Sequence, residues 1–142
     1  MVSLTSALAG KPIDVAAGLV FHQQKLLITQ RPVGTHLAGL WEFPGGKREP
    51  GESFEECLVR ELREELAIEV TLGQLFEEIT HEYPELSVRL KFFLCRLAKG
   101  EPRAIGCAAF KWATRDGLAK RNFPPADERL LRRLVDTEPL WR

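Results

Sequence analysis

The sequence predicts an α/β fold in which helices pack on a mixed β-sheet. Two apolar, β-branched segments open the chain, a strongly patterned helix follows them, and further strand-like segments precede a closing amphipathic helix. Strands and helices in this order are typical of a sheet covered by helices. The chain has 142 residues, the length of one domain with its own core, so we expect a single domain over residues 1–142.

The first two segments predict a β-hairpin. Residues 15–21 and 25–30 are rich in apolar and β-branched side chains, and the polar stretch 22–24 separates them. A loop rich in glycine and proline follows over residues 31–51, and the apolar run 40–43 interrupts it.

The clearest helix runs from Ser53 to Leu66. An apolar stripe at helical spacing begins at Phe54, which indicates that one face of this helix is buried. Ser53 is a favourable N-cap, and Glu56, three residues later, completes a capping box.

The second half of the chain predicts more strands and a closing helix. Residues 70–81 are expected to be extended, and residues 87–97 alternate apolar with polar side chains, as a half-buried strand does. Residues 108–112 predict a further strand. A pair of prolines precedes the amphipathic helix expected over residues 127–135.

Composition narrows the functional classes. Lysine plus arginine equals aspartate plus glutamate, twenty each, so the basic excess typical of nucleic-acid-binding proteins is missing and a polymer substrate is disfavoured. The three cysteines are far apart and form no CxxC pair, which suits a reducing compartment. We find no membrane span and no convincing signal peptide in residues 1–11, and therefore expect a cytoplasmic protein.

A cluster of acidic residues marks the candidate site. Glu61, Glu64 and Glu65 are spaced i, i+3 and i+4, so their carboxylates project from one side of the helix, and Glu52 lies in the loop just before it. Arg60 relieves part of the repulsion, since it follows a glutamate by four residues. From the carboxylates alone, a site for a hard cation such as Mg²⁺ or Mn²⁺ and a salt-bridged surface helix are equal alternatives.

The preceding loop favours the cation. Gly45 and Gly46 allow bare backbone to come close to a ligand, and a backbone carbonyl there could complete the shell of a metal ion. A glycine pair taken alone is more often a simple turn.

Together these residues resemble the Nudix box: a glycine, five residues, a glutamate, seven residues, Arg-Glu, an aliphatic residue, any residue, Glu-Glu, any residue, a glycine and an aliphatic residue. The match begins at Gly46, continues at Glu52 and ends with residues 60–68, RELREELAI. Ala67 is the one departure, because the family glycine ends the helix in a left-handed turn; alanine costs about 1 kcal/mol if that geometry is kept.

The resemblance implies the α/β/α sandwich of the Nudix hydrolases and roles for the matched residues. Glu61, Glu64 and Glu65, with the Gly45 carbonyl beside them, are implied metal ligands. Glu52 is implied to assist the metal site.

Arg60 is similar to the arginine that orients the box carboxylates. The implied reaction is attack of a metal-activated water on a phosphoanhydride of a nucleoside diphosphate-X compound.

The resemblance extends over most of the chain. Residues 40–47 are similar to the segment before the box in the MutT-type oxidised-purine triphosphatases and in pyrimidine triphosphate pyrophosphohydrolases. Residues 123–127 are similar to the base-reading segment of that subfamily, in which Asp127 would hydrogen-bond the base; the alternative is that Asp127 caps the following helix. Arg31, Phe43, Gly46, Lys47 and Asp127 are therefore expected to contact the nucleotide.

One position departs from the MutT-type pattern. That subfamily carries a further glutamate in the loop after the long central strand, where this chain has Gly106 and no carboxylate nearby. Either Glu101 or another acid substitutes, or the chemistry depends on the box alone.

The expected activity is hydrolysis of a nucleoside triphosphate to the monophosphate and pyrophosphate, in cleaning of the nucleotide pool. The base could be an oxidised purine, as in 8-oxo-dGTP, or a pyrimidine, as in CTP or dCTP. A non-catalytic reader of oxidised nucleotides and a hydrolase of ADP-ribose are the alternatives. The expected partner is a small nucleotide, and the expected state is a monomer or weak homodimer.

Overall fold

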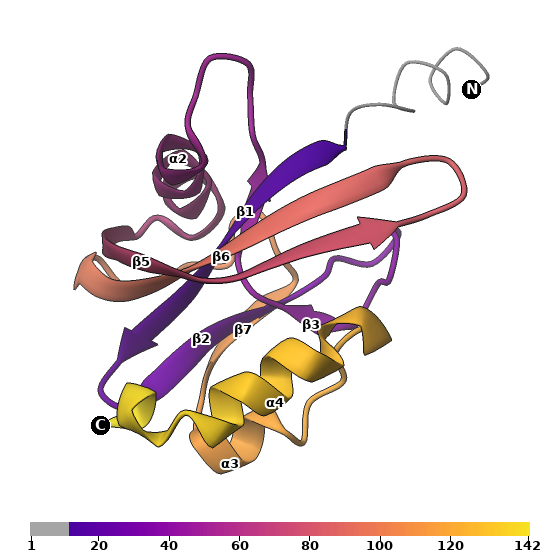
Figure 1. Cartoon of the computed structure of the whole chain (residues 1–142). Helices are drawn as coiled ribbons and strands as arrows, with labels where there is room; N and C mark the ends of the chain where they lie inside the picture. Colours follow the sequence, from indigo (N-terminus) through magenta and orange to yellow (C-terminus); the bar gives the residue numbers. More distant parts are fainter. Residues whose placement is uncertain (1–11) are drawn as a thin grey trace.

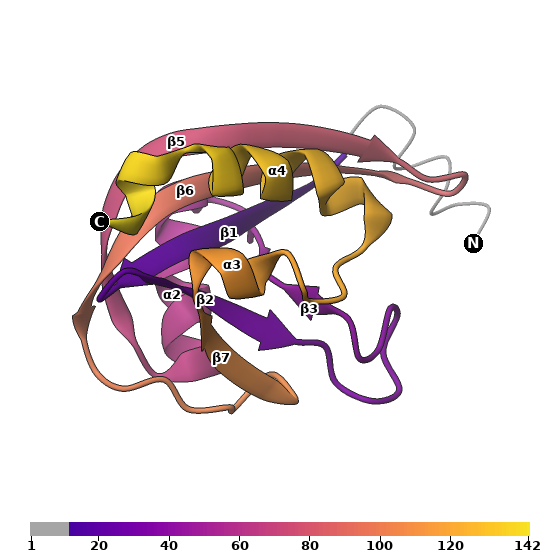
Figure 2. The same ribbon diagram turned by 90° about the horizontal axis from the view of Figure 1, so that it is seen from below.

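The computed structural model describes residues 12–142 and confirms a mixed sheet with helices on both faces (Figure 1, Figure 2). Its strands are β1 (Ile13–His22), β2 (Lys25–Gln30), β3 (Trp41–Glu42), β4 (Gly45–Lys47), β5 (Glu69–Glu82), β6 (Ser87–Lys99) and β7 (Ala109–Ala113). Its helices are α2 (Phe54–Leu66), α3 (Arg115–Leu118) and α4 (Glu128–Asp136), with the 3₁₀ turns η1 (Pro125–Asp127) and η2 (Glu138–Trp141). The expectation that residues 1–11 are no signal peptide lies outside the described residues.

Strand β1 is the centre of the sheet. It runs parallel to β6, from the pair Ile13–Val88 to the pair Phe21–Arg96, and β5 pairs antiparallel with β6 beyond it. The other edge of β1 is shared, because β4 pairs with residues 15–17 and β2 pairs with the end of the strand. This shared edge brings the Gly45-Gly46 segment into the sheet, next to α2.

The two faces of β1 support two separate cores. Ala17, Leu19 and Phe21 pack in the core that contains α4, whereas Ala16 and Val20 pack in the core that contains α2. Side chains alternate between the faces of a strand with a period of two, so one buried strand serves both layers. Within residues 12–142, no helix is long and apolar enough to cross a membrane.

The hairpin between β1 and β2 has a two-residue turn. Gln23 and Gln24 both have positive φ, 51° and 69°, between the paired residues His22 and Lys25. Two left-handed residues give a turn whose twist matches that of the flanking strands, so the predicted hairpin is confirmed.

Helix α2 begins and ends as the sequence predicts. The Ser53 hydroxyl accepts a hydrogen bond from the Glu56 N–H at 3.0 Å, and the Glu56 carboxylate accepts one from the Ser53 N–H at 2.8 Å. Ala67 ends the helix in the left-handed conformation, with φ 58° and ψ 36°. The expected pair of Arg60 with the glutamate four residues before it is wrong, because Glu56 is engaged in the capping box and Arg60 faces other carboxylates.

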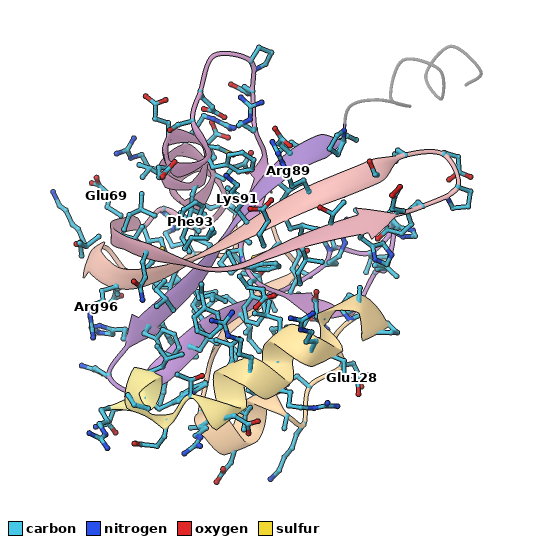
Figure 3. The ribbon with its side chains drawn as sticks, viewed as in Figure 1. Glu69, Arg89, Lys91, Phe93, Arg96 and Glu128 are labelled. Carbon is cyan, nitrogen blue, oxygen red and sulfur yellow. The ribbon has the colours of Figure 1, made fainter. Side chains whose placement is uncertain are left out.

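The start of α2 is fixed to the sheet by cations around Phe54. The Lys91 Nζ lies 4.2 Å from the centre of the Phe54 ring, and the guanidinium carbons of Arg48 and Arg89 each lie 5.5 Å from it. Asp14 pairs with both arginines. Figure 3 shows Arg89 and Lys91 on the α2 side of β6. This contact holds the loop before α2 against the sheet.

The elements that the sequence did not predict are short. Strands β3 and β4 have two and three residues, and α3 has four. Such segments carry too few residues for a periodic pattern, and only their pairing with β2 and β1 defines the two strands.

Candidate active site

A cavity of about 800 Å³ opens between segments that are far apart in the sequence. Its walls come from β1, the β5–β6 hairpin, the loop after β2, β4, the end of α2 and η1. A volume of this size suits a small molecule such as a nucleotide. The side chains around it therefore form the candidate active site.

Arg60 forms hydrogen bonds and ion pairs with carboxylates of the acidic cluster. Its guanidinium donates two hydrogen bonds to Glu52, at 3.0 and 2.7 Å, and one each to Glu61 and Glu64, both at 3.1 Å. A fourth acceptor is the Lys47 carbonyl at 3.1 Å. Glu52 thus folds back from the loop to the helix, as expected, and Arg60 donates hydrogen bonds to three carboxylates at once.

The pKa values of Glu52 and Glu61 shift in opposite directions, although Arg60 acts to lower both. Hydrogen bonds from Arg60 lower the pKa of Glu52 to about 2. Burial raises the pKa of Glu61, with further increases from Glu64 and Glu52, and Arg60 opposes this shift. Glu52 is consequently a poor proton acceptor.

Two glycines allow β4 to lie between β1 and α2. A Cβ at Gly46 would lie 2.3 Å from the Glu61 carboxyl carbon, and one at Gly45 would lie 2.0 Å from the Ala16 carbonyl oxygen. A side chain at either position would displace the carboxylate or the strand. The glycine pair is therefore required by close approach to Glu61 and β1.

Glu65 faces the cavity in an acidic environment. Burial, followed by repulsion from Glu42 and Glu61, raises the pKa of Glu65 to about 8, while Arg31 opposes the shift. Glu42, half-buried in the same wall, is the acid from outside α2 that the structure brings near Glu65. Glu101 is exposed and does not line the cavity.

Arg31 organises the loop that covers one side of the cavity. Its guanidinium donates to the His36 carbonyl at 2.7 Å and pairs with Glu42 at 3.2 Å. His36 itself lines the cavity. Arg31 thus reaches the cavity wall as expected and is already bonded to protein groups there.

Asp127 lines the cavity from η1, which leads into α4. It occupies the N-cap position, yet its side chain makes no capping hydrogen bond. Burial and the nearby Glu42 raise the pKa of Asp127 to about 6, and His81 opposes the shift. The geometry therefore does not support the helix cap as the role of this carboxylate.

The remaining expected contacts differ in exposure. Lys47 is exposed at the cavity mouth, whereas the Phe43 side chain is 5% exposed and packs on Phe92 and Phe123. Phe43 thus contributes to the cavity wall as part of the core.

The carboxylates of the acidic cluster are close together but do not all face the same point. Within residues 12–142, no three acidic, histidine or cysteine side chains are arranged to hold a metal ion. The reason is visible in the contacts, since Glu61 and Glu64 turn to Arg60 whereas Glu65 turns to the cavity. The metal ligands expected from the sequence remain a prediction.

Sequence reasoning missed the wall formed by the β5–β6 hairpin. His81 and Tyr83 line the cavity opposite the helices and pack edge to face, with ring centroids 4.4 Å apart. Both residues lie in a hairpin whose place beside β1 depends on the parallel pairing of β1 with β6. No local pattern signals such a long-range pair.

The whole arrangement is that of a known family. The family model of the NUDIX domain matches residues 16–133. The chain belongs to the Nudix family. The fold, the box helix α2 and the Gly46–Glu61 approach are therefore those of a Nudix domain in which Ala67 replaces the box glycine and keeps its left-handed conformation.

Relatives place the chain among Nudix enzymes of known activity. An 8-oxo-dGTP diphosphatase of Escherichia coli is 36% identical over 87% of this chain and 97% of its own length. A CTP pyrophosphohydrolase of the same organism is 38% identical over 85% of this chain and 90% of its own. The solution structure of the E. coli ORF135 protein superimposes with a TM-score of 0.78 at 35% identity, covering 92% of this chain and 93% of that one.

Proposed function

We propose that this Nudix hydrolase cleaves a nucleoside triphosphate to the nucleoside monophosphate and pyrophosphate, with Mg²⁺ or Mn²⁺. The observation that carries the proposal is one cavity lined by both the box carboxylate Glu65 and the base-reading candidate Asp127. The phosphates would contact the α2 side of this cavity and the base the η1 side. The activities of the two E. coli relatives support this assignment.

The residues present fit a hard divalent cation. Burial raises the pKa of Glu65, and repulsion from Glu42 and Glu61 adds to this shift; a cation would relieve that repulsion. The groups that would hold the ion are the carboxylates of Glu61, Glu64 and Glu65 and the Gly45 carbonyl. When bound, the ion would neutralise the phosphates and lower the pKa of an attacking water.

The protein groups have separate roles in this proposal. Arg60 orients Glu61 and Glu64, and Glu52 holds Arg60 through two hydrogen bonds, which suits it to positioning rather than to accepting a proton. Lys47 at the cavity mouth and Arg31 provide positive charge toward the phosphates. Phe43 and Gly46 shape the wall.

The base side of the cavity is acidic. Asp127 and Glu42 both present carboxyl groups, so a base edge rich in N–H donors is favoured. Guanine and 8-oxo-guanine offer such an edge, and cytosine offers its exocyclic amino group as a donor. We keep the oxidised purine and pyrimidine triphosphates as the two substrate classes and test them side by side.

Release of the nucleoside monophosphate, the product common to all five substrates, is measured by anion-exchange chromatography with Mg²⁺ on 8-oxo-dGTP, dGTP, CTP, dCTP and ADP-ribose, with EDTA as the control. We expect release from a triphosphate that EDTA abolishes. Turnover of ADP-ribose alone would replace the proposal by the diphosphate-hydrolase alternative. Binding of an oxidised nucleotide without turnover would indicate a reader.

The carboxylate assignment is tested by Glu64→Gln and Glu65→Gln. Each variant should lose orders of magnitude of turnover while it remains folded, because the lost charge is needed to hold the cation. Glu55→Gln is the matched control, since Glu55 is exposed in the first turn of the same helix. Near-normal turnover in both box variants contradicts the assignment.

The base assignment is tested by Asp127→Ala. Discrimination between bases should weaken more than turnover of the triphosphate moiety, since the substitution removes the base contact and leaves the box intact. An equal loss for all nucleotides contradicts a base-reading role.

The proposed setting is the cytoplasm, with a small nucleotide as partner, no nucleic-acid polymer and no membrane. Cys57, Cys95 and Cys107 are free thiols, which suits a reducing compartment. We propose a monomer or weak homodimer, which size-exclusion chromatography coupled to light scattering measures directly.

A further inference from the structure

The C-terminal end of α2 is closed by the loop that follows β6. The N–H groups of Ile105 and Gly106 both donate to the Glu65 carbonyl, at 3.1 and 3.0 Å, and the Arg103 N–H donates to the Leu66 carbonyl at 2.9 Å. Carbonyls in the last turn of a helix lack partners within the helix, so this loop satisfies them. The main chain of Glu65 is therefore fixed from outside the helix.

Gly106 also packs directly on the Glu65 side chain. A Cβ at Gly106 would lie 3.1 Å from Glu65 Cγ and 3.4 Å from Glu65 Cα. The φ of Gly106 is not in the left-handed region, so the backbone itself would accept another residue. The absence of a side chain at this position therefore matters because of Glu65.

The Glu65 carboxylate is held differently from those of Glu61 and Glu64. Among residues 12–142 it forms no ion pair, whereas Glu61 and Glu64 are both paired with Arg60. Of the charged groups around it, Glu42 and Glu61 repel it and Arg31 attracts it without forming an ion pair. The direction of this carboxylate thus depends on how its aliphatic stem and main chain are packed.

We propose that Gly106 is a positioning residue that holds Glu65 toward the cavity through its N–H and through close packing on the Glu65 stem. The inference rests on the proposed function, in which Glu65 is a cation ligand. Gly106 lines the same cavity as Glu65, so the contact is made at the wall of the site. A loop that places no carboxylate in the cavity wall would then contribute by fixing the acid of the neighbouring helix.

The test introduces side chains at Gly106 and measures cation binding without nucleotide. Free Mn²⁺ is quantified by electron paramagnetic resonance for the full-length wild type, Gly106→Ala and Gly106→Val. We expect the valine variant to bind Mn²⁺ about tenfold more weakly, as is typical when a group that orients a ligand is lost, and the alanine variant to show a smaller loss. Ala104→Val adds the same kind of bulk at an exposed position of the same loop and should bind like the wild type.

A second arm asks whether the effect passes through Glu65. In a Glu65→Gln background, Gly106→Val should produce little further loss of Mn²⁺ affinity, because the ligand that it displaces is already removed. Thermal unfolding of each metal-free variant separates folding from positioning. If the valine variant does not fold, the alanine variant decides the question.

The outcomes are distinguishable. Wild-type protein that binds Mn²⁺ while both folded Gly106 variants bind it equally well overturns the positioning role and leaves the proposed function intact. Wild-type protein that binds no Mn²⁺ overturns the cation assignment and this inference together. Full additivity of Gly106→Val with Glu65→Gln also overturns the role of Gly106 through Glu65.

Discussion

Ala67 shows how a single residue departs from a family pattern without changing the fold. It adopts the left-handed conformation at the end of α2, where its N–H bonds to the Arg63 carbonyl at 3.0 Å. A Cβ in this conformation is unfavourable by about 1 kcal/mol, and only glycine escapes that cost. The chain thus keeps the geometry of the helix end at the expense of stability.

Ala67→Gly should therefore raise the free energy of unfolding by about 1 kcal/mol, measured by urea denaturation. Ala119→Gly is the matched control, because Ala119 caps α3 in the right-handed conformation with φ −68°. Glycine there should lower stability by adding freedom to the unfolded chain. A loss of stability in both variants would contradict a strained Ala67.

Asp127 is a single residue that makes the free energy of unfolding depend on pH. Its pKa is raised from 3.8 to about 6, so the folded state binds the proton more tightly than the unfolded state does. This contribution to stability is fully present below pH 3.8 and is lost as the pH rises through about 6. Asp127→Asn should remove that loss. Above pH 6 its free energy of unfolding should therefore exceed that of the wild type by up to about 3 kcal/mol.

The cause of the shift is tested by carboxyl ¹³C NMR titration. Because Glu42 raises the pKa of Asp127, Glu42→Gln should lower that pKa toward 3.8. An unchanged Asp127 titration in Glu42→Gln would leave burial as the only cause.

Helix α2 is the element that assembles the charged side of the site. One turn of its polar face carries Arg60, Glu61 and Glu64, and its apolar face is fully buried at Leu58 and Leu62. Helical spacing alone places these groups together, so the sequence could predict them. The direction of each carboxylate still depends on Glu52 and β4, which come from outside the helix.

Arg60→Gln should weaken the pH dependence of the free energy of unfolding that arises from Glu52. The lowered pKa of Glu52 contributes stability above pH 4.5, and this contribution is lost as the pH falls from 4.5 to about 2. Without the guanidinium the pKa of Glu52 returns toward 4.5, so wild type and variant should differ more at pH 7 than at pH 2.5. Urea denaturation across this range measures the difference.

Arg63→Gln is the control for that series. Arg63 lies on the same helix, is exposed and pairs with Glu69 at 3.2 Å, whereas Glu52 pairs with Arg60. If Arg63→Gln changed the pH profile as much as Arg60→Gln, the cause would be the net charge of α2 and not the contact between Arg60 and Glu52.

The whole molecule determines the cavity, because its walls join segments from both layers. Glu65 comes from the helix on one face of the sheet, and Asp127 comes from the turn that leads into the helix on the other (Figure 2). Arg133 of α4 stacks 4.0 Å from the Phe76 ring and pairs with Glu77, which holds this second layer against β5. A ligand that fills the cavity should therefore stabilise the entire domain.

A non-hydrolysable triphosphate analogue with Mg²⁺ should raise stability by about 2.7 kcal/mol at a hundred times its Kd, measured by thermal unfolding. EDTA should remove most of this gain, and Glu65→Gln should reduce it. An equal gain with and without EDTA would show that the phosphates bind without the cation.

The sequence by itself determined the parts of this protein that depend on local patterns. The helix from its Ser53 cap to Leu66, the hairpin of β1 and β2, and the acidic cluster all follow from spacing over a few residues, whereas the left-handed end at Ala67 was implied only by the resemblance to the Nudix box. Backbone hydrogen bonding and side-chain periodicity are local, so such features can be deduced without partners.

Only the tertiary structure decided which distant groups share the site. The parallel pairing of β1 with β6 placed His81 in the cavity wall, and the return of the loop after β6 brought Gly106 to Glu65. Likewise, Glu42 rather than Glu101 became the acid beside Glu65 because β3 pairs with β2 at the cavity. These contacts depend on packing between segments tens of residues apart, for which a single sequence carries no periodic signal.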